Sequence, residues 1–188
     1  MSPPPPQVRL SHRIAVGLLV FLLLLLAGLA TARAGEFVPS VGYSRTPEST
    51  NNQMIYGVSL RGGGKNRMVS ELAVGYRNED YSGGDMAVRT IPVTFSAWAS
   101  PFQSLYVGGG GGYYYTTQKY REGLGLSNSS ARQFAYHWGG GMRLPMGRTS
   151  GIDLQYRNVL LKKQSDALPA GSFDPSYWSM SVGISMRY

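Results

Sequence analysis

The sequence has 188 residues and a formal net charge of +8, from 18 Lys and Arg against 10 Asp and Glu. These positive charges are spread along the chain without runs, which argues against nucleic acid as a partner and permits contact with anionic lipid headgroups. Because the chain has no cysteine, a disulfide framework and a thiolate metal site are both excluded.

The N-terminal segment has the pattern of an export signal. Two arginines precede the uncharged apolar stretch 14–30, and the segment 32–34, Ala-Arg-Ala, fits a small-x-small cleavage site. We predict that residues 1–34 form a cleaved signal peptide and that residues 35–188 form one domain. The alternative is an uncleaved membrane helix, because the apolar stretch is close to the shortest length that spans a bilayer.

Eight later stretches alternate apolar residues with small or polar ones, which is typical of strands with one apolar face. They are centred on 37–43, 54–60, 68–76, 91–95, 105–115, 134–144, 152–160 and 178–188.

The connections between these stretches alternate between long and short. The long polar ones are 45–53, 78–85, 117–130 and 162–175, and the short ones are 62–67, 99–102 and 145–149. An up-and-down barrel with both termini in the periplasm and long loops outside requires this alternation. We therefore predict an all-β fold, an eight-stranded antiparallel transmembrane β-barrel in the bacterial outer membrane.

The chain resembles the small eight-stranded outer-membrane barrels, the OmpA/OmpX-like and opacity-protein-like family, in its export signal, strand number, Tyr106–Tyr113 glycine segment and final aromatic residue. The resemblance covers essentially all of residues 35–188, and we expect no peptidoglycan-binding domain after the barrel. It implies a porin-like barrel in a Gram-negative cell surface, with Tyr188 as the signal recognised by the barrel-assembly machinery. It implies little about function, because one fold supports many activities.

Several charged residues lie on the inward face of the predicted strands. Because buried charges are costly unless they are paired, we predict an ion-pair network that plugs the narrow lumen of eight strands. Its predicted members are Arg61, Glu71, Arg77, His137, Arg143, Asp153 and Arg157. A specific conduction path through these residues is the alternative.

Two register predictions can be made. Centring the sixth and seventh strands on the turn 145–149 places Arg143 opposite Gly151 and His137 opposite Arg157, all on the polar face. Centring the long loop 117–130 near Leu124 places the glycine run 108–112 of the fifth strand across from the run 139–141 of the sixth, which would leave room for a bulky interior residue.

His137, the one histidine of residues 35–188, is the first candidate for catalysis. The histidine-x-serine arrangement of lipid A deacylases is absent and the side chain points inward by parity, so we predict no catalytic residue. We also predict no cofactor or metal, and we interpret Glu79, Asp80 and Asp85 as a solvated loop tip rather than a weak calcium site.

Aromatic residues are expected to form interfacial girdles near the strand ends. We place Tyr43, Tyr76, Tyr113 and Tyr115 near the outer ends and Trp98, Tyr106 and Tyr188 near the inner ends.

The predicted function is that of a non-enzymatic outer-membrane barrel with a structural or surface-interaction role through its long loops. The expected partners are outer-membrane lipid and lipopolysaccharide, the assembly machinery, and a surface ligand of loops 117–130 and 162–175. The alternatives are a narrow channel or carrier for small or apolar solutes and, second, a lipid A-modifying enzyme.

Overall fold

The structure is a computed structural model. It describes residues 35–47, 49, 51–63, 67–81, 86–102, 104–121, 127–165 and 172–188. The predicted signal peptide at residues 1–34 lies outside these residues. In the part of the chain that is described, no helix has the length and apolar character needed to cross a membrane.

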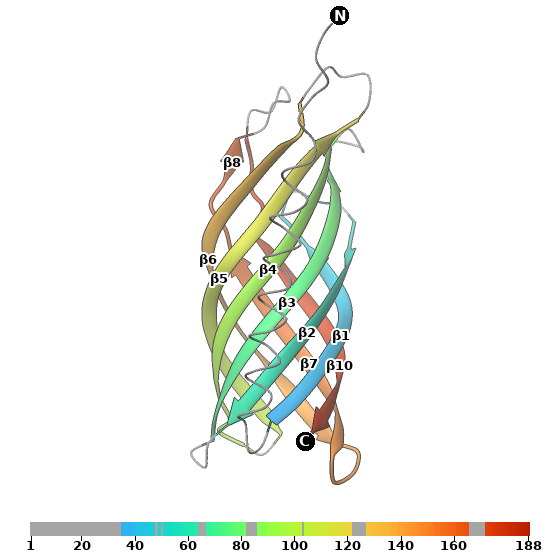
Figure 1. Cartoon of the computed structure of the whole chain (residues 1–188), viewed down its shortest axis with the longest axis vertical. Helices are drawn as coiled ribbons and strands as arrows, with labels where there is room; N and C mark the ends of the chain where they lie inside the picture. The colour runs from blue at the N-terminus through green and yellow to red at the C-terminus, as the bar shows by residue number, and fades with distance from the viewer. Residues whose placement is uncertain are drawn as a thin grey trace, which may run out of the picture. The chain divides into compact units, whose positions relative to one another are not determined.

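Alternating apolar and polar residues form the strands of one barrel. The strands are β1 (Gly35–Arg45), β2 (Gln53–Gly63), β3 (Met68–Tyr81), β4 (Met86–Ala99), β5 (Leu105–Tyr120), β6 (Ser129–Pro145), β7 (Ser150–Leu160) and β10 (Tyr177–Arg187). Within the described residues these eight strands close in the order β1-β10-β7-β6-β5-β4-β3-β2, each antiparallel to its neighbours (Figure 1). The predicted eight-stranded antiparallel barrel is confirmed.

The two faces of the wall differ as the alternation predicts. On β4, for example, Ile91 and Phe95 are exposed on the outside, whereas Thr90, Thr94 and Ser96 are buried on the inside. A closed ladder leaves no unpaired strand edge in the wall, and an apolar outer surface is what lipid requires. The outward face is therefore the lipid-facing surface of a transmembrane barrel.

The strands run further toward the long loops than the sequence predicts. β3 continues to Tyr81 and β4 begins at Met86, while β5 continues to Tyr120 and β6 begins at Ser129. The predicted loops 78–85 and 117–130 are therefore shorter in the structure. Beyond the bilayer both faces of a strand meet polar surroundings, so the backbone ladder continues where the apolar alternation has ended.

The predicted loop 162–175 contains a short hairpin that the sequence did not indicate. Its two strands, β8 (Gln164–Ser165) and β9 (Ser172–Phe173), pair with each other outside the barrel. At two residues each, these strands are too short to show a period of two in the sequence.

Candidate functional site: charged residues inside the barrel

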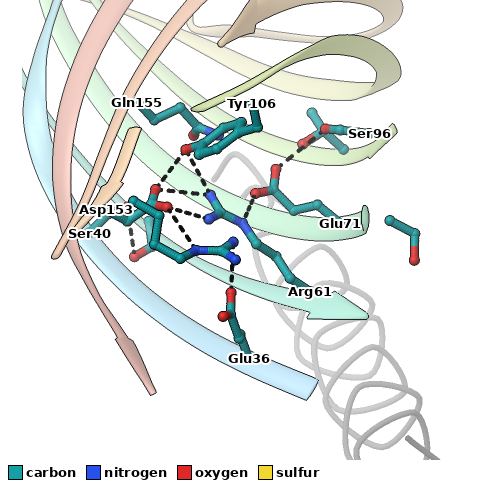
Figure 2. Close-up of polar contacts among 12 residues, drawn as sticks. Glu36, Ser40, Arg61, Glu71, Ser96, Tyr106, Asp153 and Gln155 are labelled. Carbon is teal, nitrogen blue, oxygen red and sulfur yellow. Dashed lines mark hydrogen bonds and ion pairs between the residues drawn. The ribbon is translucent and has the colours of Figure 1, made fainter. Parts of the chain in front are cut away.

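Arg61 is the centre of a charged cluster inside the barrel. Its Nε donates to Glu71 Oε2 at 2.6 Å, and its Nη1 and Nη2 donate to Asp153 Oδ2 at 2.5 Å and Oδ1 at 3.1 Å. Figure 2 shows the guanidinium between these two carboxylates. Because β1 and β10 separate β2 from β7 in the wall, the contact between Arg61 and Asp153 crosses the lumen.

Each carboxylate of this cluster contacts two arginines. Glu71 also pairs with Arg157 Nη2, and Asp153 Oδ2 lies 3.9 Å from Arg143 Nε. The third carboxylate, Glu36, lies 2.8 Å from Arg143 Nη2 and accepts a 2.9 Å hydrogen bond from Arg187 Nε. The result is an alternating chain, here called the interior network: Arg187, Glu36, Arg143, Asp153, Arg61, Glu71 and Arg157.

Hydroxyl groups supply further partners for the buried carboxylates. Tyr106 donates its hydroxyl to Asp153 Oδ1 at 2.8 Å, and Ser96 donates its hydroxyl to Glu71 Oε1 at 3.4 Å. Such bonds matter because a buried ion pair is stable only when its remaining lone pairs are also satisfied. The network is thus an extensively hydrogen-bonded unit that links six strands.

The sequence prediction missed two members of the interior network, Glu36 and Arg187. Glu36 precedes Phe37 on the first strand, and Arg187 precedes Tyr188 at the end of the last. By the alternation of their strands both residues lie on the inward face, so the sequence pattern already indicated that they point into the barrel.

Arg77, which we predicted in the same network, belongs to a second group nearer the long loops. Its Nη2 pairs with Glu79 of the same strand, and its Nε donates to Ser44 Oγ at 2.9 Å. Thr46 Oγ1 donates to Glu79 Oε1 at 2.9 Å, and the Arg77 guanidinium lies 4.3 Å from the centre of the Tyr177 ring. We call Arg77 and Glu79 the outer pair.

Our interpretation of Glu79 as part of a solvated loop tip is wrong. Glu79 lies on β3 with only 1 % of its surface exposed, because it shares the inward face with Glu71 and Arg77. Asp80, the next residue, is exposed on the outside, and Asp85 lies outside the described residues.

His137 is buried and points inward, as parity predicts. Its Nε2 lies 2.8 Å from Ser96 Oγ, which connects it through this serine to Glu71. A hydrolytic triad requires the carboxylate on the other ring nitrogen, and His137 Nδ1 has no hydrogen-bond partner among the described residues. The arrangement is therefore unlike that of a serine hydrolase.

The predicted register between β6 and β7 is wrong by two residues. Arg143 pairs with Asp153 and His137 with Val159, because Pro145 still belongs to β6 and pairs with Gly151. The turn is therefore centred one residue later than predicted. A shift of two residues leaves every side chain on the same face, which is why the inward assignments hold although the partners differ.

The glycine runs of β5 and β6 meet at one pair, Gly108 opposite Gly139, rather than along their length. A Cβ atom on Gly108 or Gly110 would collide with the backbone of β4, so the close approach of the strands requires glycine there. At Gly141 the space that a side chain would need is filled by the ring of Tyr106.

Trp98 and Tyr106 are not girdle residues, contrary to our prediction. They are 1 % and 4 % exposed inside the barrel, where their rings pack edge to face at 5.5 Å. The guanidinium of Arg157 lies 5.4 Å from the Trp98 ring. Both are an odd number of residues from the outward-facing Phe95 and Leu105 of their strands, so the alternation itself contradicted the assignment. The other girdle residues, Tyr43, Tyr76, Tyr113, Tyr115 and Tyr188, are exposed on the outside.

Two cavities adjoin the interior network, and Arg61 lines both. One of about 70 Å³ lies toward the outer pair, with Gln155, Arg157 and Tyr177 in its wall. The other, of about 250 Å³, lies toward the chain end Tyr188 and is also lined by Glu36, Arg143 and Arg187. The Arg61 side chain is therefore part of the wall of both cavities. Among the described residues, no cluster of three or more acidic or histidine side chains could hold a metal ion.

Comparisons with known proteins identify the fold. The chain is similar to Neisserial surface protein A, with 11 % identity over 82 % of this chain and 96 % of that one and a TM-score of 0.57. It is similar to OprG of Pseudomonas aeruginosa, with 12 % identity over 84 % of this chain and 97 % of that one and a TM-score of 0.57. It is also similar to Ail, the attachment invasion locus protein of Yersinia pestis, in complex with the heparin analogue sucrose octasulfate. Here the identity is 12 % over 82 % of this chain and 97 % of that one, and the TM-score is 0.55. No protein-family model and no curated protein matches the sequence.

Proposed function

We propose that this chain, an eight-stranded β-barrel with the fold of small bacterial outer-membrane proteins, is a non-enzymatic outer-membrane protein with a structural or surface-interaction role. In this proposal the interior network plugs the lumen, and the long loops contact a partner outside the cell. The observation that carries the plug is the position of Arg61, whose guanidinium bonds carboxylates on β3 and β7 and whose side chain lines two cavities.

The bonds of Arg61 explain why this residue would act as a plug. Its side chain is almost completely buried, and both of its acidic partners are themselves held by further arginines or hydroxyls. Moving one member would leave a buried charge unpaired, which is strongly unfavourable. The network therefore favours a single closed arrangement.

The loop role is supported by the rigidity of the barrel that presents the loops. Segments 117–130 and 162–175 remain our candidates, with the β8–β9 hairpin as an ordered part of the second. A barrel of the same fold, Ail, has been seen in complex with sucrose octasulfate, so an anionic saccharide is one chemical class to test as a ligand.

Conductance in planar bilayers tests the plug. We expect no steady channels from the unaltered barrel and a measurable conductance from Arg61→Ser, which shortens the side chain that lines both cavities. Arg148→Ser, in the exposed turn between β6 and β7, removes the same charge elsewhere and should conduct no more than the unaltered protein. Steady channels in the unaltered protein that disappear in Arg143→Gln or Glu71→Gln would support the narrow-channel alternative instead.

Lipid A mass profiles from cells with and without the protein test the non-enzymatic assignment. We expect identical profiles. A modification that depends on the protein and disappears in His137→Ala would establish the enzyme alternative, because His137 is buried beside Ser96.

The role of Tyr188 as an assembly signal is also a proposal. Its side chain is half exposed at the end of β10, where its backbone N–H donates to Gly35 O at 3.2 Å across the β1–β10 seam. Deleting Tyr188 should reduce insertion in cells while purified protein still refolds in detergent. Normal insertion in cells without Tyr188 would contradict this role.

A further inference from the structure

Three neighbouring strands carry a basic residue on the outward face within four residues of one another in register. Arg89 on β4 lies opposite Thr117 on β5, and Arg132 on β6 lies opposite Tyr115, two residues before Thr117. Lys119 follows on the same face of β5, and all three basic side chains are exposed. β4, β5 and β6 lie side by side in the wall (Figure 1). We call Arg89, Lys119 and Arg132 the basic cluster.

The basic cluster lies just beyond the apolar band. On β5 the outward residues from Leu105 to Tyr115 are apolar or aromatic, and this stretch rises about 25 Å along a barrel axis tilted by about 40° from the strand. That rise equals the height of the lipid-facing band in such barrels. Lys119 is therefore at the level of the lipid headgroups, at the end of the barrel that carries the long loops.

The side chains of the basic cluster have charge to offer a ligand. Within the described residues, none of the three forms an ion pair, although the exposed carboxylate of Asp80 lies on the same outward face of β3. The guanidinium of Arg132 lies 5.4 Å from the centre of the Tyr113 ring. A ring in this position orients a guanidinium but leaves its N–H edge open for an anion.

The residues beneath the cluster indicate that the partner is a lipid. Tyr113 and Phe134 pack edge to face at 5.5 Å, as do Phe134 and Tyr136 at 5.1 Å, and all three are exposed toward the bilayer. A ligand that contacts both the aromatic residues and the basic cluster must have an apolar part below and an anionic part above. Lipids of the outer leaflet have that construction, whereas a soluble anion does not.

We propose that the outward face of β4, β5 and β6 is a binding site for the phosphorylated headgroup of lipopolysaccharide, with Arg89, Lys119 and Arg132 as the phosphate-binding residues. This inference rests on the proposed placement in the outer membrane. Adjacent strands lie about 4.8 Å apart and the two residues are offset by two positions, so the backbones of Arg89 and Arg132 are roughly 12 Å apart and their long side chains can contact one headgroup. Basic residues also lie at the same end of other strands, Arg45 on β1 and Lys162 after β7, but β10 separates these two strands, whereas Arg89, Lys119 and Arg132 lie on three adjacent strands.

Native mass spectrometry of the barrel refolded in detergent and titrated with bisphosphorylated lipid A tests the site. We expect R89Q/K119Q/R132Q to weaken lipid A binding at least about tenfold, because each cation near an anionic surface contributes separately. R89K/R132K keeps the charges and should retain binding. The double variant R67Q/R148Q removes exposed basic residues at the opposite end of the barrel and should bind lipid A as the unaltered barrel does.

Two results would overturn the proposal: unchanged lipid A binding by R89Q/K119Q/R132Q, or equally strong binding of dephosphorylated lipid A. Equally tight binding of a soluble heparin fragment through the same three residues would also overturn it, because the surface would then serve a soluble anion. The heat-dependent gel mobility of each variant confirms that the barrel is folded. Since conductance does not depend on this surface, failure of the lipid site and failure of the plug can be distinguished.

Discussion

The barrel contains two groups of buried charges that differ in how they are connected. The interior network joins six strands, and each of its carboxylates contacts two arginines. The outer pair consists of two residues of β3 and is held to the end of β1 by Ser44 and Thr46. The residue types are the same in both groups, yet among the described residues only the first has ion pairs between different strands.

This difference shows that the consequence of a buried charge depends on which strands it connects. An ion pair between distant strands restrains the cross-section of the barrel, whereas an ion pair within one strand restrains that strand and the few residues that contact the pair. We therefore expect alterations in the interior network to affect the whole barrel and alterations in the outer pair to act locally. Three substitutions, in Glu71, Glu79 and Arg187, test this expectation.

Glu71→Gln should have the largest effect, because it removes the negative charge that Arg61 and Arg157 share. We expect the free energy of unfolding to fall by about 3 kcal/mol or more, as when one partner of a buried ion pair is removed. Urea unfolding in detergent, followed by tryptophan fluorescence, measures it. Asp80→Asn, which neutralises an exposed carboxylate on the same strand, should change stability by less than about 0.5 kcal/mol. Equal effects of the two variants would contradict the comparison.

Glu79→Gln should have a smaller and local effect. The amide can still accept the hydrogen bond from Thr46, but Arg77 loses its carboxylate partner. We expect a loss of about 1–3 kcal/mol in unfolding free energy. Hydrogen exchange should increase at the ends of β1 and β3 near Ser44 and not around Arg61. Faster exchange throughout the barrel would show that the outer pair also acts globally.

Arg187→Gln should have the smallest effect, although Arg187 belongs to the interior network. Half of its side chain is exposed, so solvent already screens its pair with Glu36. We expect a loss below about 1 kcal/mol that disappears in 1 M salt, whereas the loss in Glu71→Gln persists there. A salt-independent loss similar to that of Glu71→Gln would show that the network acts as one unit as far as its rim.

The alternation of side chains was sufficient to predict the fold and the faces. A period of two places Arg61, Glu71 and Asp153 inside whatever their partners are, because register errors of two residues do not change the face. The partners themselves could not be predicted. The centre of the turn after β6 depends on Pro145 remaining in the strand, and the contact of Arg61 with Asp153 depends on how side chains extend across the lumen.

Errors occurred where an expectation about residue type was preferred to the alternation. The girdle prediction for Trp98 and Tyr106 rests on the frequency of aromatic residues at membrane interfaces, and the loop interpretation of Glu79 rests on the polarity of its segment. All three are inward by parity and buried in the structure. The outward basic cluster was missed for a different reason, since Arg89, Lys119 and Arg132 come together only through the pairing of three strands.

The interior network also bears on how the barrel inserts. Arg61 and Asp153 are separated by 92 residues of sequence, and Glu36 and Arg187 by 151, so these charges meet only after strands from both ends of the chain are in place. Before closure, Arg61 could pair only with Glu71 of the adjacent strand, and Glu36 and Arg187 would lack their mutual bond, so an open sheet would carry incompletely paired charges into hydrocarbon, which is costly. Pairing of these charges is therefore completed only when the wall closes. Folding is expected to be slow and all-or-none, with partly inserted chains held at the membrane surface until the first and last strands join.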